Sequence, residues 1–398
     1  MVNIKSHVKK RNAFHEKLKV LIIVGHYLPG YKSGGILRSV ENTINYLHND
    51  FKFFIITRNH DIDDAKPYQN IKQSQWGTLG HTQVLYLKST SFRSICRIVN
   101  QTEYDIIHLN SFFEPLSIKI LLANKIGKIK CGSIVLSPRG EFGWASLRLR
   151  FYKKLGYILI SRLFGFFNGI KWHASVIHEK KDIIKIMSVE ESNILLAKDL
   201  PIYISKKTLP ATKKYKDNSS LRIVFISNIS PEKNLHYAIN VLSKVKVQIV
   251  FNIYGRIVNE KYWKKCQRLI KTLPDHVLTS YFGELKPNEV VSTFSKYDLF
   301  LFPSGGENYG HVIAESLSSG TPVLISKNTP WLDLESLNLG WDIDLKNMDS
   351  FVEIIEKLAR MSHNERQDKQ NNIRKIIKDI LINSSDLEDN RFLYQQSF

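Results

Sequence analysis

Short apolar runs alternate with amphipathic stretches along the whole chain, a pattern typical of parallel α/β sheets. The run Lys19–Val24 is rich in β-branched residues, and a glycine-containing loop and a helical spacing of apolar residues follow it. This order predicts a buried strand, a loop and a helix. Further strands of the first half are expected at Phe51–Thr57, Val84–Leu87, Asp105–Asn110 and Ser133–Ser137.

The pattern restarts in the second half of the 398-residue chain. Leu221–Ile226 predicts another buried strand, and its loop leads into another helical pattern. Later strands are expected at Val247–Tyr254, Leu278–Phe282, Leu299–Phe302 and Val323–Ser326. Because one core rarely fills a chain of this length, the sequence predicts an α/β fold with two Rossmann-like doubly wound domains.

A polar string, SKKTLPATKKYKDNSS, separates the two halves and predicts an interdomain linker. It divides the chain into five expected segments. These are a basic N-terminal extension at 1–17, a first domain at 18–204, the linker at 205–220, a second domain at 221–375, and a helical tail at 376–398 that packs back on the first domain.

The formal net charge is +20, and it is concentrated in the first 200 residues, which hold 30 Lys and Arg against 15 Asp and Glu. Such an excess favours an anionic partner: phosphate groups, a membrane surface or nucleic acid. Nucleic acid ranks last, because no nucleic-acid-binding motif accompanies the charge. Three cysteines without metal-type spacing, no signal-peptide pattern and no apolar run long enough to span a bilayer predict a reduced, cytoplasmic protein.

One segment combines positive charge with apolar bulk. Residues 146–172 hold six Lys and Arg, no Asp or Glu, and several Leu and Phe. We therefore expect a basic amphipathic helix on an anionic membrane surface, which would place the protein peripherally on the inner face of the plasma membrane. The alternative is a pair of core helices with a basic outer face.

The segment from Phe302 to Val323 is the richest in candidate chemistry. Glu307 ends a glycine loop beyond an expected strand, and Glu315 follows eight residues later in an expected helix, about 12 Å further on. That separation exceeds the roughly 5 Å between the carboxyl groups of a retaining glycosidase. It suits the two ends of an extended ligand, because a carboxylate accepts hydrogen bonds from vicinal hydroxyls. The alternative is that these glutamates are solvated surface residues.

Other residues are candidates for binding phosphate. Lys233, between a strand and a helix, would neutralise a leaving diphosphate, and an exposed lysine is the alternative. Gly34 and Gly35 would let the backbone approach a phosphate closely, and an ordinary tight turn is the alternative. The backbone N–H groups of His311 and Val312 at a helix start also suit a phosphate.

The remaining charged candidates carry weaker signals. Arg139 and Glu141 follow the last clear strand of the first half, which places them at the carboxyl edge of the sheet, facing the cleft. A structural turn with a buried ion pair is the alternative. The strings Asp61-Ile-Asp63 and Asp342-Ile-Asp344 resemble metal-binding pairs, but neither lies in a glycine loop, so we expect surface acids and no metal site.

Together these motifs resemble the retaining GT-B glycosyltransferases of the glycosyltransferase group 1 family, over nearly the whole chain. Glu307 and Glu315 look like that family's signature pair, and the segments Gly34-Gly35, Ser230–Lys233 and Gly320–Val323 fit its other motifs. The likeness is greatest to bacterial members that build surface polysaccharides. It rests on the strings Leu109–Phe113, Pro138–Glu141, Glu307–Ile313 and Thr329–Trp331.

The resemblance implies two domains that face a central cleft, with the acceptor on the first and the nucleotide sugar on the second. It implies that Glu315 holds the ribose, that Lys233 meets the diphosphate, and that Glu307 with the backbone after it holds the donor sugar. That backbone and the residues implied to frame the base are Asn308, Tyr309, Gly310, His311, Val312, Phe282 and Gly283.

The sequence departs from the family pattern at one position. The family usually has an arginine five residues before the lysine, and here that position is Asn228. Arg139 lies where many members carry an active-site histidine, and it is a candidate for supplying the missing charge. Lys233, the helix N-termini and Arg139 would then balance the leaving diphosphate without a metal.

The expected activity is transfer of a hexose-type sugar from a nucleoside diphosphate sugar to a lipid-linked or saccharide acceptor in surface polysaccharide synthesis, with retention of configuration. No cofactor is expected besides the donor, and a UDP-sugar is favoured over a GDP-sugar. Two alternatives stay open. One is a non-catalytic sugar-nucleotide-binding subunit of a polysaccharide assembly complex, which Asn228 favours. The other is a GT-B nucleotide-sugar epimerase, which would not be expected to keep the glutamate pair.

Overall fold

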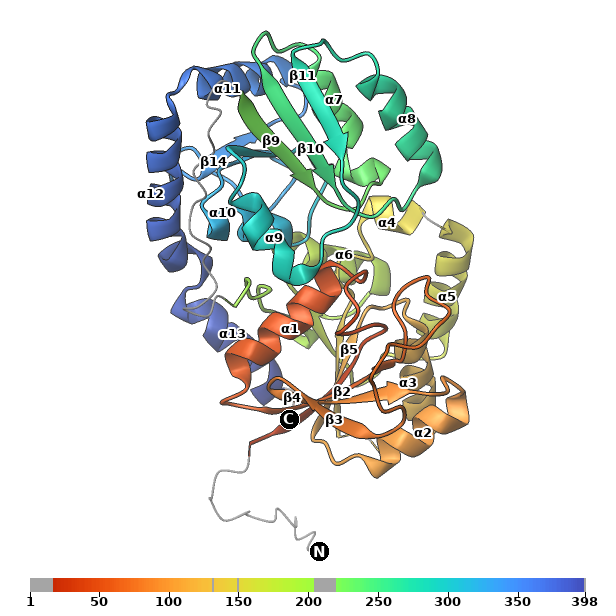
Figure 1. Cartoon of the computed structure of the whole chain (residues 1–398). Coiled ribbons are helices and arrows are strands. Elements are labelled where there is room, and N and C mark those ends of the chain that lie inside the picture. Colours follow the sequence, from red (N-terminus) through yellow and green to blue (C-terminus); the bar gives the residue numbers. More distant parts are fainter. Residues whose placement is uncertain (1–16, 131, 149, 204–219, 397–398) are drawn as a thin grey trace, which may run out of the picture.

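The computed structural model describes residues 17–130, 132–148, 150–203 and 220–396 as two α/β domains (Figure 1). The expected extension at 1–17 and the expected linker at 205–220 lie almost wholly outside these described residues. Each domain is built on a largely parallel sheet with helices on its faces, so the predicted fold class is confirmed.

The first domain contains an eight-stranded sheet in the order β3-β4-β2-β1-β5-β6-β7-β8, parallel except where β3 meets β4. Its strands are β1 (Lys19–Ile23), β2 (Lys52–Arg58), β3 (Trp76–Leu79), β4 (Thr82–Leu87), β5 (Ile106–Asn110), β6 (Ser133–Ser137), β7 (Lys171–Ala174) and β8 (Ile194–Leu196). Its helices are α1 (Gly35–Leu47), α2 (Phe92–Gln101), α3 (Pro115–Lys125), α4 (Trp144–Arg148), α5 (Phe151–Leu163) and α6 (Ile177–Met187).

The second domain contains a six-stranded sheet in the order β11-β10-β9-β12-β13-β14, parallel throughout. Its strands are β9 (Leu221–Ile226), β10 (Ile249–Tyr254), β11 (Val277–Tyr281), β12 (Leu299–Phe302), β13 (Val323–Ser326) and β14 (Gly340–Ile343). Its helices are α7 (Leu235–Leu242), α8 (Glu260–Ile270), α9 (Pro287–Phe294), α10 (His311–Ser319), α11 (Met348–Arg360) and α12 (His363–Leu381).

The strand order places a topological switch point in each sheet. In the first domain β1 lies between β2 and β5, and in the second β9 lies between β10 and β12. The loops that leave these neighbouring strands diverge to opposite faces, which opens a crevice at their carboxyl ends. The candidate loops after β1, β9 and β12 therefore all leave their sheets at such crevices.

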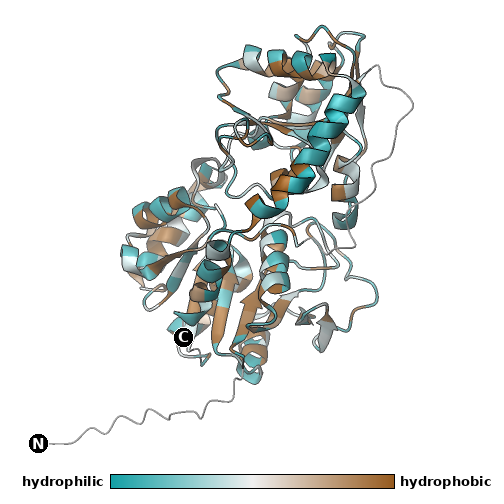
Figure 2. Cartoon of the chain, turned by 90° about the vertical axis from the view of Figure 1, so that its left-hand side faces the viewer, coloured by the Kyte–Doolittle hydropathy of each residue, from teal (hydrophilic) through white to brown (hydrophobic). Residues whose placement is uncertain are grey.

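Apolar side chains pack on both faces of each sheet. Along β1, Val20 and Ile22 join the core cluster that includes α1, whereas Leu21 and Ile23 join the cluster on the other face. This alternation follows from the two-residue period of a strand. Figure 2 shows hydrophobic strands in the interior and hydrophilic outer faces on the helices.

The C-terminal tail divides between the two domains. The expected tail start at residue 376 falls inside α12, and Ile377 and Leu381 of that helix pack in the core of the second domain. The helix α13 (Ser384–Gln395) lies against the first domain, where Tyr394 is fully buried. The expected tail boundary is thus corrected, because the apolar spacing of α12 continues past residue 376.

Tyr394 begins a buried polar chain that crosses the first sheet. Its hydroxyl lies 3.0 Å from His108 Nδ1, and His108 Nε2 lies 2.7 Å from Ser137 Oγ. Ser137 Oγ lies 2.7 Å from His173 Nδ1, and His173 Nε2 lies 2.8 Å from the carbonyl oxygen of Ala197. The carbonyl oxygen of Ala197 can only accept a hydrogen bond, so His173 Nε2 must donate to it. Each earlier group in the chain then donates to the next one, which requires both imidazoles to be neutral. Burial lowers the pKa of both histidines, which keeps them neutral.

Replacing Tyr394 with Phe should destabilise the protein by about 1 kcal/mol, because buried His108 Nδ1 then loses its donor. Urea unfolding at pH 8 measures this. Tyr152→Phe is the control, since that side chain is 87% exposed. Equal midpoints for both variants would contradict the assigned chain. In the wild type, the stability that comes from the neutral histidines should be complete above about pH 6.5 and fall as the pH is lowered, because their folded-state pKa values are depressed.

Candidate active site

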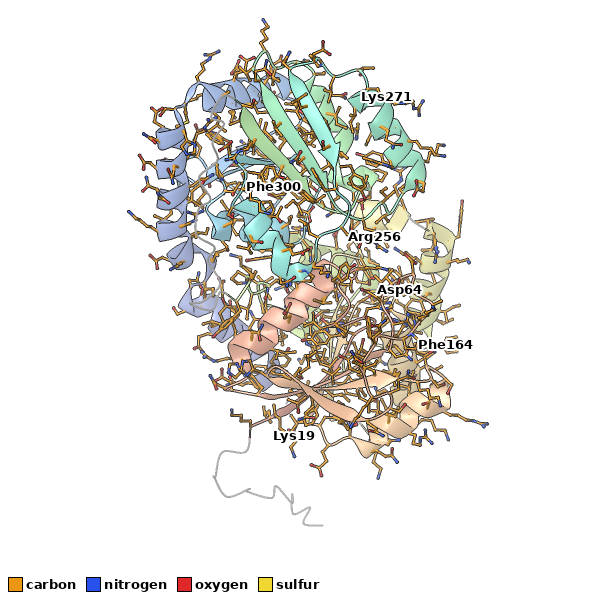
Figure 3. The ribbon with its side chains drawn as sticks, in the orientation of Figure 1. Lys19, Asp64, Phe164, Arg256, Lys271 and Phe300 are labelled. Carbon is orange, nitrogen blue, oxygen red and sulfur yellow. The ribbon has the colours of Figure 1, made fainter. Side chains whose placement is uncertain are left out.

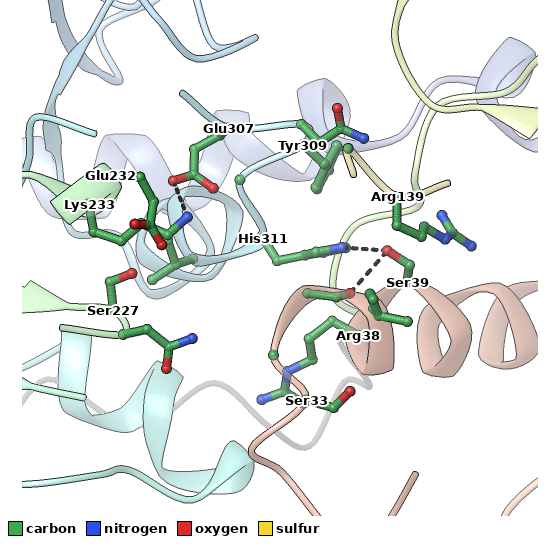
Figure 4. A pocket seen from close by; sticks show the side chains of 18 of the residues that line it. Ser33, Arg38, Ser39, Arg139, Ser227, Glu232, Lys233, Glu307, Tyr309 and His311 are labelled. Atoms are coloured by element: carbon green, nitrogen blue, oxygen red, sulfur yellow. Dashed lines mark hydrogen bonds and ion pairs between the residues drawn. The ribbon is translucent and has the colours of Figure 1, made fainter. Parts of the chain in front are cut away.

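A cavity of about 880 Å³ lies between the two domains. Its walls come from the loops after β1 and β6 in the first domain and from the loops after β9, β10 and β12 in the second. It collects most of the residues that the sequence singled out: Gly34, Gly35, Arg139, Asn228, Lys233, Glu307, Asn308, Tyr309, Gly310, His311, Val312 and Glu315. Figure 4 shows how several of them converge from both domains.

Lys233 and Glu307 form one ion pair at the wall of the second domain. Lys233 Nζ lies 2.6 Å from Glu307 Oε1 (Figure 4). Ser304 Oγ donates to the same carboxylate oxygen at 2.7 Å. Lys233 ends the single 3-10 turn η2 (Pro231–Lys233) after β9, and Glu307 lies in the loop after β12. Adjacent strands thus bring a cation and a carboxylate that are 74 residues apart into contact.

Glu315 forms the second ion pair, across the cleft. It lies on α10 of the second domain, and its Oε1 is 3.3 Å from Nε of Arg38 on α1 of the first domain. Burial raises the pKa of Glu315, and the Arg38 guanidinium opposes that rise. Arg38 also contacts Glu41 at 3.1 Å, one turn further along α1. Arg38 is a cavity residue that was not predicted from the sequence.

Two helix N-termini point into the cavity. Helices α1 and α10 both follow glycines with positive φ, Gly34 at 62° and Gly310 at 82°. In the described part of the chain no side chain caps either helix, and neither first turn holds an acidic residue. Backbone N–H groups at such helix starts bind anions, and the helix dipole favours negative charge there. Gly34, Gly35 and His311, whose backbone the sequence predicted to bind phosphate, therefore lie at these two helix starts.

Further hydrogen bonds join the domains across the cleft. His311 Nε2 lies 2.9 Å from Ser39 Oγ of α1, and burial lowers the pKa of His311 to about 4. Asn308 Nδ2 donates to Ser175 Oγ at 2.8 Å and to Glu179 Oε2 at 3.0 Å. Both contacts link the loop and helix after β12 to the first domain. The Asn308 side chain is thus engaged by the other domain.

The structure favours the structural interpretation of Arg139 and Glu141. The Arg139 side chain is 5% exposed, pairs with Asp199, and donates to Asn110 Oδ1 through both Nε and Nη2. Glu141 accepts hydrogen bonds from the backbone N–H groups of Phe112 and Phe113. Since its charge is already balanced by a buried partner, Arg139 is a weak candidate for replacing the charge missing at position 228.

Phe282 and Gly283 are not among the residues that line this cavity. The Phe282 ring is 56% exposed and stacks on Tyr254, with ring centroids 5.2 Å apart. The carbonyl oxygen of Gly283 accepts a hydrogen bond from the N–H of Gly255, which does line the cavity. A role in framing the base stays a prediction for this pair.

One expectation about the Asp-x-Asp strings is wrong. Asp61 is buried, and its side chain accepts hydrogen bonds from the backbone N–H groups of Tyr31 and Lys32, which shape the loop that leads to Gly34. Its neighbour Asp63 is exposed and pairs with Arg256 across the cleft. Among the residues that the structure describes, no cluster of three or more His, Cys, Asp or Glu is arranged to hold a metal ion.

Known proteins match both the sequence and the fold. Residues 209–376 match the family model for glycosyl transferases group 1. A relative from Klebsiella pneumoniae, an uncharacterized 41.2 kDa protein in the cps region, is 23% identical over 286 residues, which cover 70% of this chain and 76% of the relative.

Solved structures share the fold at low sequence identity. Anabaena Alr3699/HepE in complex with UDP and glucose has a TM-score of 0.65 at 12% identity, over 95% of this chain and 99% of that chain. WaaG, a glycosyltransferase involved in lipopolysaccharide biosynthesis, has a TM-score of 0.61 at 14% identity, over 94% of this chain and 99% of that chain.

The two facing domains define a protein with the GT-B fold, as predicted. The family match over residues 209–376 agrees with the resemblance seen in the motifs.

Gly255 in the cavity wall should not tolerate a side chain. At φ +139°, a Cβ there would lie 1.7 Å from the backbone oxygen of Ser227. We expect Gly255→Ala to destabilise the protein by about 3 kcal/mol or more, because backbone must move to relieve the clash. The control is Gly283→Ala, whose Cβ would meet nothing within 4 Å and whose cost, about 1 kcal/mol, comes from its φ of +77° alone. Chemical unfolding of both variants measures this, and similar losses would contradict the clash.

Proposed function

We propose that the protein transfers a hexose-type sugar, with retention of configuration, from a nucleoside diphosphate sugar to a lipid-linked or saccharide acceptor in surface polysaccharide synthesis. Glu315 binds the ribose and Glu307 binds the donor sugar. Lys233 and the N-termini of α1 and α10 stabilise the diphosphate. The donor is a UDP-sugar in preference to a GDP-sugar, and no metal takes part. This part of the assignment rests on the family resemblance and on the cleft chemistry.

One observation carries the proposal: a single cleft presents two carboxylates, the buried Glu315 and the half-buried Glu307, together with a lysine and two uncapped helix N-termini. A nucleoside diphosphate sugar has vicinal hydroxyls at both ends and two phosphates between them. Carboxylates accept hydrogen bonds from hydroxyls, and cations and helix N-termini bind phosphate. As the glycosidic bond breaks, charge grows on the diphosphate, so preorganised positive groups there act mainly on the transition state.

The comparisons support the same context. HepE was solved with UDP and glucose, and WaaG takes part in lipopolysaccharide biosynthesis. Thermal stabilisation by a panel of UDP-, GDP- and ADP-sugars tests the donor, since a ligand at about 100 times its dissociation constant adds roughly 2.7 kcal/mol.

Turnover separates the proposal from its two alternatives. A non-catalytic subunit would bind the donor without transferring or hydrolysing it, and an epimerase would return an isomerised nucleotide sugar. A product whose anomeric configuration, measured by NMR, matches that of the donor supports the retaining transfer. Inversion would overturn the proposed stereochemistry alone.

The two glutamates should separate nucleotide binding from sugar binding. Glu315→Ala should weaken binding of both UDP and the UDP-sugar by about 1.5–3 kcal/mol, because a buried charged hydrogen bond to the ribose is lost. Glu307→Ala should slow transfer but leave UDP affinity near the wild-type value. Calorimetry and initial rates measure the two effects.

The matched comparison is between these two variants, which remove the same group from two positions in one cavity. Equal losses of UDP affinity in both would overturn the division of roles. Unchanged UDP affinity in Glu315→Ala would remove this residue from the nucleotide site.

We also propose that the first domain docks on an anionic membrane through α5. Apolar side chains on this helix and just after it are exposed, among them Tyr152 at 87%, Leu163 at 83% and Phe164 at 59%. Figure 3 places Phe164 on the outer surface of this domain. The basic residues Arg150 and Lys153 lie at the start of the same helix and are exposed. Apolar side chains beside exposed cations suit the boundary between lipid headgroups and acyl chains.

The membrane contact would be peripheral. In the described part of the chain, no helix is both long and apolar enough to cross a bilayer. Lys154, in contrast, donates to the carbonyl oxygen of Ser146 and lies 4.7 Å above the Phe113 ring, so it belongs to the packing of the helix. The docking surface therefore excludes Lys154.

Vesicle co-sedimentation should show binding to anionic lipid that is lost in high salt, because salt screens the attraction. Each basic residue near an anionic surface contributes about 1 kcal/mol, so Arg150→Gln with Lys153→Gln should lower binding markedly. Leu163→Ser with Phe164→Ser should lower it further at any salt concentration. The control is Lys264→Gln with Lys265→Gln on the exposed face of α8, which removes the same charge elsewhere. Equal binding to neutral vesicles would contradict the electrostatic part.

A further inference from the structure

The cavity contains more acidic than basic side chains. Among the residues that the structure describes, seven carboxylates and five Lys or Arg side chains line it. Each of the five cations is paired with a carboxylate: Lys32 with Asp64, Arg38 with Glu315 and Glu41, Arg139 with Asp199, Lys233 with Glu307, and Arg256 with Asp63. A diphosphate that enters this cleft therefore meets Lys and Arg side chains that are already paired with carboxylates.

Two of these pairs differ from the rest, because hydroxyl groups of the donor can take the place of the cation at the carboxylate. Lys233 is held by Glu307 and Arg38 by Glu315, and these are the carboxylates assigned to the sugar and ribose hydroxyls. When hydroxyls bind a carboxylate, its cation becomes available to the phosphates of the same ligand. Asp63 and Asp64 do not line the cavity, so a donor in the cavity would not compete for Arg256 or Lys32 in this way.

We propose that Arg38 is a donor-binding residue: the ribose displaces its guanidinium from Glu315, and the guanidinium then binds the diphosphate. This rests on the proposed function and adds a cation from the first domain to it. Arg38 would supply the positive charge that Asn228 does not. The exchange is balanced, since both charged groups leave one charge-assisted contact and enter another.

The position of Arg38 suits this role. It lies in the first turn of α1, three residues after Gly35, where uncapped backbone N–H groups already favour an anion. Glu41, one turn along the helix, contacts its Nη1 at 3.1 Å and would retain the side chain when Glu315 is released. The guanidinium has five N–H donors, enough to bind Glu41 and a phosphate together. Arg139 lacks this freedom, because Asp199 and Asn110 hold it in the interior.

The test compares UDP with uridine, which has the same ribose and base but no phosphate. In Arg38→Gln, UDP affinity measured by calorimetry should fall about 10- to 100-fold, the range of a lost charge-assisted hydrogen bond. Uridine affinity should stay the same or rise, since Glu315 no longer has to leave an ion pair. Unchanged or tighter UDP binding would overturn the proposal, and so would an equal loss for both ligands.

Two further variants separate ligand binding from folding. Arg38→Lys keeps the charge but not the bidentate geometry, so its loss of UDP affinity should be smaller. Adding Asn228→Arg to Arg38→Gln should restore part of the UDP affinity, which a merely structural role for Arg38 would not produce. Arg360→Gln, on a side chain that is 76% exposed, is the control for loss of one positive charge. No rescue together with a lowered melting temperature would assign Arg38 to folding instead.

The outcomes also distinguish this proposal from the proposed function. If wild-type protein binds none of UDP, GDP and ADP, both are overturned. If it binds UDP and transfers sugar while Arg38→Gln retains full UDP affinity, the proposed function stands and Arg38 is removed from the donor site.

Discussion

Buried carboxylates in the cleft need a partner, and this constraint organises the site. Glu315 lies almost completely buried between the domains, where an unpaired charge would be strongly unfavourable. Arg38 of the first domain balances it, just as Lys233 balances Glu307 within the second domain. The same pairing allows a ligand to separate the charges, because its hydroxyls can bind the carboxylate and its phosphates can bind the cation of each pair. A ligand with hydroxyls alone would separate Lys233 from Glu307 and Arg38 from Glu315 without giving either cation a new partner.

Polar contacts join the two domains across the cleft. Ser39 with His311, Asn308 with Glu179, and Arg256 with Asp63 join the domains at the cavity walls, and Figure 3 labels Arg256 where the domains meet. Interfaces of this kind favour relative movement, whereas large apolar ones oppose it. The helix α13 differs, because Tyr394 is buried among Phe51 and Phe53. The chain end is therefore anchored to the first domain.

The sequence predicted those parts of the fold that carry a strong local pattern. Long β-branched runs such as Leu221–Ile226 coincide with strands, whereas β7 and β14 were missed because Lys171–Ala174 and Gly340–Ile343 are short and mix charged or glycine residues with apolar ones. Most candidate residues that the glycine loops and the glutamate spacing identified in the sequence lie in one cavity. Arg38 was missed because its proposed role depends on its contact with Glu315, which is 277 positions away, and no local sequence pattern encodes that contact. Asp61 was misjudged for the same reason, since its burial follows from the loop that folds over it.

This geometry offers a physical explanation for Asn228, which occupies the position where the family usually has an arginine. A group that binds a diphosphate needs positive charge near it, but the charge can come from either wall of a cleft that closes on its ligand. A cation on the second domain binds whether the cleft is open or closed, whereas Arg38 reaches the phosphates only when α1 is close to α10. A positive charge on the first domain instead of the second would therefore couple full binding of the diphosphate to closure of the cleft. Binding of the diphosphate would then depend on the position of the first domain, where the acceptor is expected to bind. An enzyme built in this way would leave its donor less exposed to water until the domains meet, because its complete set of positive groups assembles only in the closed cleft.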